Sequence, residues 1–189
     1  MSPMTVRDFE RRYRADPDPW GYLDSPYERA KYEVTLAACG AGPFTAALEL
    51  GASIGVFSEL LAERCQALTT IDFSAAAVAL ARERLTGRAN VEVIVGEIPD
   101  ALPAGRRDLI VASEILYYLD AGALTATLAA LERRLVPSGR LVCVHWRPGG
   151  SDRPLDAERV HDEVKRQPWL AHVRSEATDG YLLDVLARR

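Results

Sequence analysis

Cysteine is scarce in this chain of 189 residues, which has Cys39, Cys65 and Cys143 only. The three are far apart and odd in number, and no Cys-x-x-Cys pair occurs. This spacing argues against a zinc knuckle and against a disulfide framework, so we expect no metal site. Reduced, buried thiols are typical of a cytoplasmic protein, and we expect that location.

Long apolar runs and an excess of positive charge are also missing. The longest apolar run, residues 109–119, is interrupted by Glu114 and is far shorter than the about 20 residues of a membrane span. Residues 1–14 are rich in arginine and have no apolar stretch, which argues against a secretory signal. The net charge is −4, with 23 Lys and Arg against 27 Asp and Glu. We therefore expect neither a membrane nor a nucleic acid as a partner.

What the sequence does contain, from residue 45 onward, is an alternation of short apolar runs and helical patterns. The predicted strands are 46–50, 68–71, 91–95, 109–112 and 141–145. The predicted helices are 56–64, 75–85, 123–135 and 157–166. Nearly all-apolar strands separated by helices indicate a parallel sheet covered on both faces. Segments 170–174 and 181–186, joined by a turn at Asp179-Gly180, add an antiparallel hairpin.

The sequence thus predicts a single Rossmann-like α/β domain with a mostly parallel seven-stranded sheet. Before it, residues 5–15 have helical spacing and are stopped by the prolines of segment 16–19. A second helix is expected over residues 26–39, with Ser25 as its N-cap. We interpret residues 1–44 as a helical lid on the Rossmann-like region 45–189.

A glycine-containing loop follows the first predicted strand, in the sequence Leu48-Glu49-Leu50-Gly51-Ala52-Ser53-Ile54-Gly55. Gly51 and Gly55 let the chain turn from a strand into a helix and let a ligand approach the backbone. We therefore predict that Gly51, Ala52, Ser53 and Gly55 bind a cofactor, although a pair of glycines also occurs in simple tight turns.

An acidic residue closes the second predicted strand about twenty residues after the loop. Asp72 at this distance could accept hydrogen bonds from both hydroxyls of a ribose. The alternative is that Asp72 caps the next helix, but Ser74 can do so itself. We predict that Asp72 and the adjacent Phe73 contact the cofactor.

The loop resembles the first motif of class I methyltransferases, with Ser53 where the middle glycine usually stands. Two further features fit this resemblance: Glu49 on the strand, and a turn at residues 137–139 that leads into the fifth strand. The resemblance implies S-adenosylmethionine as the cofactor. It implies that Glu49 lies under the methionyl amino group or orders the loop. It also implies that Glu97 and Ile98, after the third strand, meet the adenine, although a surface turn would look similar.

Three patches resemble a narrower family, the nodulation protein S N-methyltransferases. They are Asp18-Pro19-Trp20, Ser25-Pro26-Tyr27-Glu28 and residues 112–119 (Ala-Ser-Glu-Ile-Leu-Tyr-Tyr-Leu), and the likeness runs from about residue 16 to 147. Enzymes of that family methylate the free amine of a deacetylated glucosamine on a chitin oligosaccharide. The resemblance therefore implies a small-molecule acceptor that carries an amine, such as an amino sugar.

In this interpretation Trp20 belongs to a lid over the cofactor, or else it only packs against the second helix. Arg29 could reach the methionyl carboxylate, unless it is a solvated helix residue. Ser113, directly after the fourth strand, is predicted as a further cofactor contact.

Methyl transfer to an amine needs alignment and an unprotonated nucleophile. Glu114 is the predicted base, because it interrupts an apolar run at the end of the fourth strand; a structural carboxylate is the alternative. Tyr117 and Tyr118 could flank the acceptor with their rings, although one of them is expected to lie in the core instead. His145, at the end of the fifth strand, could be a second base or a hydrogen-bonded rim residue.

Other functions stay open from the sequence. An O-methyltransferase would use the same residue types. An NAD-dependent oxidoreductase is disfavoured by Glu49 and by the lack of a Tyr-x-x-x-Lys motif. A non-catalytic cofactor-binding domain would tolerate Ser53. A nucleic-acid methyltransferase would be expected to carry Asn/Asp-Pro-Pro-Tyr/Phe after the fourth strand. The sequence does not distinguish a monomer from a homodimer.

Overall fold

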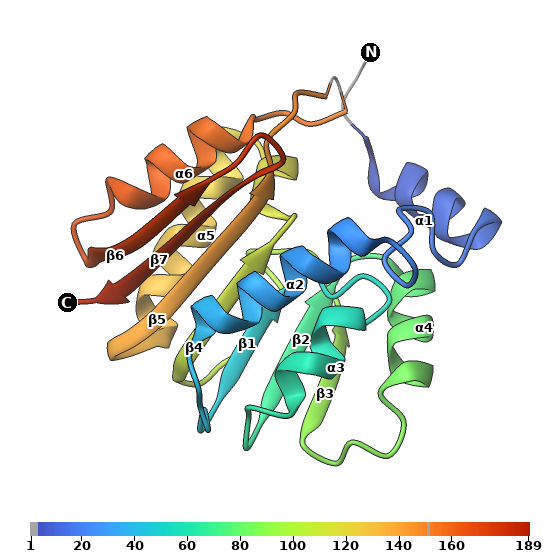
Figure 1. Ribbon diagram of the computed structural model, residues 1–189, viewed down its shortest axis with the longest axis horizontal. Helices are drawn as coiled ribbons and strands as arrows, with labels where there is room; N and C mark the ends of the chain where they lie inside the picture. Colours follow the sequence, from blue (N-terminus) through green and yellow to red (C-terminus); the bar gives the residue numbers. More distant parts are fainter. Residues whose placement is uncertain (1–3, 151) are drawn as a thin grey trace.

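The computed structural model describes residues 4–150 and 152–189. Within these residues one seven-stranded sheet runs through the molecule in the order β3-β2-β1-β4-β5-β7-β6 (Figure 1). Its strands are β1 (Ala47–Leu50), β2 (Leu68–Asp72), β3 (Val91–Val95), β4 (Arg107–Ser113), β5 (Leu135–Trp146), β6 (Leu170–Ala177) and β7 (Tyr181–Arg188). The first five are parallel to their neighbours, and β7 pairs antiparallel with both β5 and β6. The predicted Rossmann-like sheet with its terminal hairpin is confirmed.

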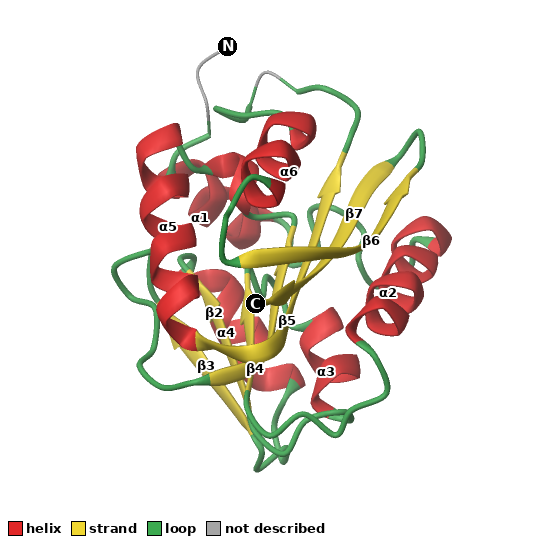
Figure 2. Cartoon of the chain, turned by 90° about the vertical axis from the view of Figure 1, so that its left-hand side faces the viewer, coloured by secondary structure: helices red, strands yellow, loops and turns green. Residues whose placement is uncertain are grey.

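Helices cover both faces of the sheet. The helices are α1 (Val6–Ala15), α2 (Pro26–Cys39), α3 (Val56–Ala62), α4 (Ala75–Arg84), α5 (Ala121–Arg134) and α6 (Ala157–Lys165), with a short 3-10 helix η1 (Leu116–Tyr118). In Figure 2, α5 and α6 lie on one side of the sheet and α2 and α3 on the other. All residues of β1 and β2 are buried, including the polar side chains of Glu49, Thr70 and Asp72.

Local signals set the ends of the N-terminal helices. The Ser25 hydroxyl accepts a hydrogen bond from the Glu28 amide, and Pro26 occupies the first turn of α2. Helix α2 ends at Gly40, whose φ of 102° is a left-handed conformation. The predicted boundaries of this helix are therefore confirmed.

Hydrogen bonds fasten the segment before β1 to the sheet domain. Glu10 of α1 accepts hydrogen bonds from the Ser74 hydroxyl (3.0 Å) and the Ala76 amide (3.2 Å), at the start of α4. The Met4 amide donates to the carbonyl of Asp152 at 2.9 Å. Helix α1 thus lies over the carboxyl ends of β1 and β2 (Figure 1), where a lid would have to be, although the division into lid and domain stays a prediction.

The predicted turn at residues 137–139 is wrong in its details. The segment lies inside β5, where the register with β4 shifts, so it forms a bulge instead of a reversal. The left-handed residue is Ser138, with φ of 62°, and not Gly139. Gly139 is required for space, because a Cβ there would lie 2.7 Å from the carbonyl oxygen of Val136.

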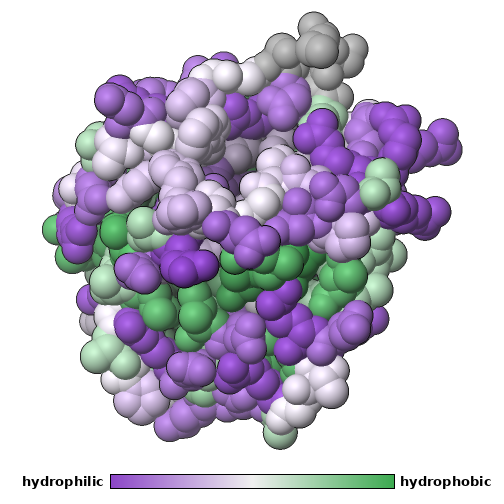
Figure 3. All heavy atoms as spheres, turned by 45° about the vertical axis from the view of Figure 1, so that its right-hand side comes forward, coloured by the Kyte–Doolittle hydropathy of each residue, from purple (hydrophilic) through white to green (hydrophobic). Residues whose placement is uncertain are grey.

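The surface is mostly polar, but apolar side chains gather in a band across the face shown in Figure 3. Of the helices in the described part of the chain, none is both long and apolar enough to pass through a bilayer. Residues 4–150 and 152–189 likewise contain no cluster of three or more His, Cys, Asp or Glu side chains that could hold a metal ion.

Candidate functional site

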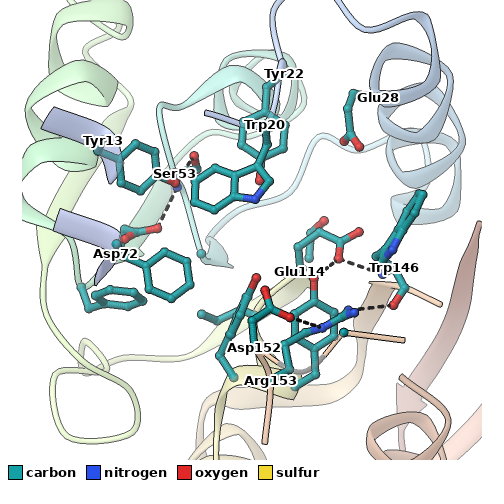
Figure 4. Close-up of a pocket in the computed structure, with 18 of the residues that line it drawn as sticks. Tyr13, Trp20, Tyr22, Glu28, Ser53, Asp72, Glu114, Trp146, Asp152 and Arg153 are labelled. Atoms are coloured by element: carbon teal, nitrogen blue, oxygen red, sulfur yellow. Dashed lines mark hydrogen bonds and ion pairs between the residues drawn. The ribbon is translucent and has the colours of Figure 1, made fainter. Parts of the chain in front are cut away.

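A cavity of about 420 Å³ opens at the carboxyl ends of β1, β2 and β4, between the N-terminal segment and the loop after β5. This is the edge where ligands of open α/β sheets bind. The residues that line it are Phe9, Tyr13, Trp20, Tyr22, Glu28, Lys31, Gly51, Ser53, Asp72, Phe73, Ser113, Glu114, Ile115, Tyr117, Tyr118, Trp146, Gly149, Gly150, Asp152 and Arg153. Figure 4 shows Ser53 and Asp72 on one side of the cavity, and Glu114, Trp146 and Arg153 on the other.

The two glycines of the loop are needed for different reasons. Gly51 has φ of 81°, and a Cβ there would lie 3.1 Å from the Ile115 side chain and 3.2 Å from the Ser113 carbonyl oxygen. Gly51 therefore provides a bare backbone on the cavity wall. Gly55, with φ of 80°, is the N-cap of α3 and lets that helix approach Ala81 of α4.

Between these glycines, Ser53 connects the loop to two neighbours. Its amide donates to Asp72 Oδ2 at 2.8 Å, and its hydroxyl is 2.6 Å from the Tyr13 hydroxyl of α1. Ser53 has φ of 48°, the left-handed conformation that a glycine would adopt more readily. Ala52 is buried, and its amide donates to the Ile71 carbonyl.

Asp72 is buried at the end of β2 on the cavity wall. One carboxylate oxygen accepts the Ser53 amide and the other accepts the Ser74 amide at 2.9 Å. Burial raises the pKa of Asp72 to about 6. The N-cap of α4 is Ser74, whose hydroxyl accepts the Ala77 amide, so helix capping does not account for Asp72. Phe73 lines the cavity beside it, as expected of a cofactor contact.

Glu49 points away from the main cavity, toward α3 and β2. It accepts hydrogen bonds from the Ser58 hydroxyl (2.5 Å) and the Thr70 hydroxyl (2.8 Å), and it is 2% exposed. Burial raises its pKa to about 7. It lines only a small neighbouring void of about 30 Å³, together with Gly51 and Ala52. Of the two roles expected for Glu49, the ordering of the loop is the one that these contacts favour.

Glu49, Ala52 and Gly55 do not line the main cavity, and three further predicted cofactor contacts lie away from it as well. Glu97 is exposed in the loop after β3, and Ile98 packs against the core on the side of α5. Arg29 is exposed on α2. Successive helix residues differ by about 100° in direction, so Arg29 faces solvent, whereas Glu28 and Lys31, three apart, share the cavity face. The structure therefore gives these three predictions no support.

Glu114 lies on the side of the cavity opposite Asp72 (Figure 4). Its Oε1 accepts from Lys31 Nζ at 2.8 Å, and its Oε2 accepts from the Trp146 amide at 2.8 Å and from the Tyr117 hydroxyl. Its φ of 56° bends the chain sharply after β4 and turns the side chain inward. Three donors thus hold this carboxylate in place.

Lys31 belongs to the site, although no motif in the sequence points to it. It is 3% exposed, and its ammonium lies 2.9 Å from Glu28 Oε2 and 2.8 Å from Glu114 Oε1. Its two carboxylate partners raise the pKa of Lys31 even though burial lowers it. The ammonium therefore stays charged and links α2 to the end of β4.

Of the two interpretations of His145, the structure gives the base no support and favours a hydrogen-bonded residue. The imidazole is completely buried, and its Nε2 accepts the Leu116 amide at 3.1 Å. Its Nδ1 lies 3.0 Å from Nε2 of His161, whose Nδ1 lies 2.6 Å from Asp184. Burial holds the pKa of His145 well below its usual value. The alternation of side chains along β5 turns His145 toward α6, and the next residue, Trp146, faces the cavity.

Aromatic rings form much of the cavity wall. Trp20 packs on Phe9, Tyr13 and Tyr22, with ring centroids 5.2–6.0 Å apart, and it lines the cavity as predicted. Both Tyr117 and Tyr118 line the cavity, and Tyr117 is also buried in the core, as expected for one of the two. The Arg153 guanidinium lies 4.5 Å from the centroid of the Tyr117 ring. These faces suit a flat sugar or a cation.

Several known proteins are similar to this chain in sequence. The sequence model of the family described as Nodulation protein S (NodS) matches residues 2–148. The chain is 36% identical over 151 residues to a nodulation protein S of Rhizobium tropici, covering 79% of this chain and 60% of that protein. It is 35% identical over 133 residues to one of Sinorhizobium fredii, covering 69% and 62%. The chain thus spans about three fifths of the length of these relatives.

A solved structure agrees with the sequence comparisons. The crystal structure of N-methyltransferase NodS from Bradyrhizobium japonicum WM9 in complex with S-adenosyl-L-homocysteine has a TM-score of 0.87 and 26% identity. The match covers 98% of this chain and 99% of that one. The chain therefore belongs to the nodulation protein S family and has the Rossmann-like fold of S-adenosylmethionine-dependent methyltransferases.

Proposed function

We propose that this protein transfers a methyl group from S-adenosylmethionine to the amine of a small molecule, with an amino sugar as the first acceptor to test. The observation that carries the proposal is one continuous cavity with two chemically different sides. Gly51 and Asp72 lie on the first side, and Glu114 lies on the second. The names of the relatives, one of them an N-methyltransferase, support an amine as the acceptor.

The first side fits the cofactor on two counts. Gly51 leaves a stretch of bare backbone on the cavity wall. A side chain at this position would press against Ile115. Asp72 keeps a buried carboxylate on the wall, with its orientation fixed by two backbone amides. A carboxylate held in this way can accept hydrogen bonds from paired ribose hydroxyls. When bound, the cofactor supplies an activated methyl group on a sulfonium.

The second side fits an amine. The carboxylates of Glu28, Glu114 and Asp152 can balance an ammonium, and the rings of Trp146 and Tyr117 can lie against it. The lid residues and the aromatic wall exclude water, and the chain aligns the nucleophile with the methyl carbon. An O-methyl acceptor would not need this concentration of acidic side chains.

The test is calorimetric titration with S-adenosylhomocysteine. Asp72→Ala should lose cofactor binding and keep the wild-type circular dichroism spectrum, whereas Glu97→Ala, in an exposed loop, should bind normally. Titration with NAD should give no heat of binding. Normal affinity of the Asp72 variant would contradict the cofactor side, and saturable NAD binding would favour an oxidoreductase instead.

A further inference from the structure

We propose that Glu28 is the catalytic base of this cavity, accepting the proton of the acceptor's ammonium, and that Glu114 is a fixed counter-charge. The inference rests on the proposed function, because it assumes an amine acceptor. The sequence suggests Glu114 as the base. The structure instead favours Glu28, which lies three residues before the buried Lys31 on α2.

Glu114 is poorly placed to take a proton. Both of its oxygens already accept hydrogen bonds, from Lys31 on one side and from Trp146 and Tyr117 on the other. Protonating the carboxylate would break or reverse at least one of these bonds, at the cost of leaving a buried donor unsatisfied. The arrangement keeps Glu114 ionised and fixes the end of β4 against β5.

Glu28 is far less restrained. It lies on the cavity wall with a side chain that is 12% exposed. Lys31 Nζ donates to Oε1 at 3.0 Å and lies 2.9 Å from Oε2, so within the described residues Lys31 is the one polar partner of this carboxylate, whereas Glu114 has three. Burial raises the pKa of Glu28, and the Lys31 charge opposes this shift. A carboxylate on the cavity wall with a single partner and a raised pKa is better suited to exchange a proton.

The charges around the acceptor side favour a cation. Three carboxylates (Glu28, Glu114 and Asp152) face the cavity, against two cations (Lys31 and Arg153). The sum is one negative charge, which an incoming ammonium would neutralise. Lys31 is already paired with two glutamates and Arg153 with Asp152, so the surplus falls on the pair of glutamates around Lys31.

Protons and electrons balance in the transfer. The ammonium transfers one proton to the Glu28 carboxylate, and the freed nitrogen lone pair forms a bond to the methyl carbon. The carbon–sulfur bond breaks and its electron pair stays on sulfur, which gives neutral S-adenosylhomocysteine. The product leaves as a secondary ammonium, and Glu28 releases its proton to solvent.

The titration of Glu28 depends on the groups that face it. On its own helix these are Lys31 and Tyr27, and from the end of β4 Glu114. Asp18, in the segment before α2, adds a further negative charge. Lys31 alone lowers the pKa of Glu28, and the two carboxylates raise it.

The experiment compares Glu28→Gln with Glu33→Gln, an exposed glutamate on the same helix. D-glucosamine and the fully deacetylated chitin trimer are the methyl acceptors, and initial rates are measured from pH 6 to pH 10. Glu28→Gln should bind S-adenosylhomocysteine within about twofold of the wild type and should be about 10²-fold slower at pH 6, where the acceptor amine is mostly protonated. Its rate should rise by up to about tenfold per pH unit until the amine is deprotonated, and the wild type should reach its plateau at a lower pH.

A second variant separates chemistry from structure. Glu28→Asp keeps a carboxylate and should recover part of the rate together with the plateau. Glu28→Gln with a wild-type pH profile and a rate within about fivefold of wild type would overturn the inference, as would loss of S-adenosylhomocysteine binding in this variant. Wild-type protein that binds no S-adenosylhomocysteine, or methylates neither amine, would instead overturn the proposed function itself.

Discussion

The stability of the Glu49→Gln variant relative to the wild type should increase as the pH rises from acidic to alkaline. Glu49 is buried between Ser58 and Thr70, and burial raises its pKa from 4.5 to about 7. The difference of about 2.5 pH units corresponds to about 3 kcal/mol of unfolding free energy. A glutamine side chain has no proton to exchange, so the Glu49→Gln variant lacks this pH-dependent cost.

The sign follows from the protons bound in each state. Between pH 4.5 and pH 7 the folded protein holds a proton on Glu49 that the unfolded chain has released. The free energy of unfolding therefore falls as the pH rises through this window, and the loss is complete above about pH 7. The amide of the introduced glutamine has a constant cost of its own, because its NH₂ lacks an acceptor. The informative quantity is thus the change with pH and not the effect at a single pH.

Urea denaturation followed by tryptophan fluorescence, at pH 5, 6, 7 and 8, measures this change. The difference in unfolding free energy between Glu49→Gln and wild type should shift in favour of the variant by about 2–3 kcal/mol from pH 5 to pH 8. Glu92→Gln, at an exposed position of β3, is the control and should follow the wild-type curve. Stability curves of wild type and Glu49→Gln that run parallel within about 0.5 kcal/mol would show that Glu49 folds in its ionised form.

Three other substitutions probe the same site. Lys31→Met should destabilise the protein by about 3–5 kcal/mol, because Glu28 and Glu114 lose the buried cation between them. An unchanged midpoint of urea denaturation would contradict this. Tyr13→Phe removes the hydrogen bond to Ser53 and should cost about 1 kcal/mol, seen as faster amide exchange in α1. Since burial lowers the pKa of His145, the unfolded chain binds its proton first, and wild-type stability should fall as the pH drops below about 6.5. The His145→Asn variant should lose less stability than the wild type over this acidic range. An equal loss of unfolding free energy in both proteins would contradict the prediction.

The fold was predictable because its signals are local. Every residue of β1 and β2 is buried, and apolar residues (leucine, alanine and isoleucine) recur along the two strands, which made them recognisable in the sequence. Gly51 directly follows β1 and Asp72 is the last residue of β2, so their place at the carboxyl edge of the sheet could be derived from the sequence. Ser25 and Gly40 mark the ends of α2 in the same way.

The acceptor side was harder to predict because distant segments build it. Lys31 and Glu114 are 83 positions apart in sequence, and only the packing of α2 over the end of β4 makes them an ion pair. His145 shows a different limit. Adjacent residues of a strand face opposite sides of the sheet, so an error of one position exchanges the buried His145 for the cavity-lining Trp146.

Ser53 is the departure from the methyltransferase loop that the structure explains. A glycine at this position would adopt the left-handed conformation with less strain, but it would offer no hydroxyl to α1. The Ser53 hydroxyl meets Tyr13, and its amide meets Asp72. One residue thus joins the N-terminal helix, the glycine loop and the carboxylate at the end of β2. A change in the position of α1 would therefore reach Asp72 through two hydrogen bonds, so closure of the N-terminal segment and binding at the cofactor side should be coupled.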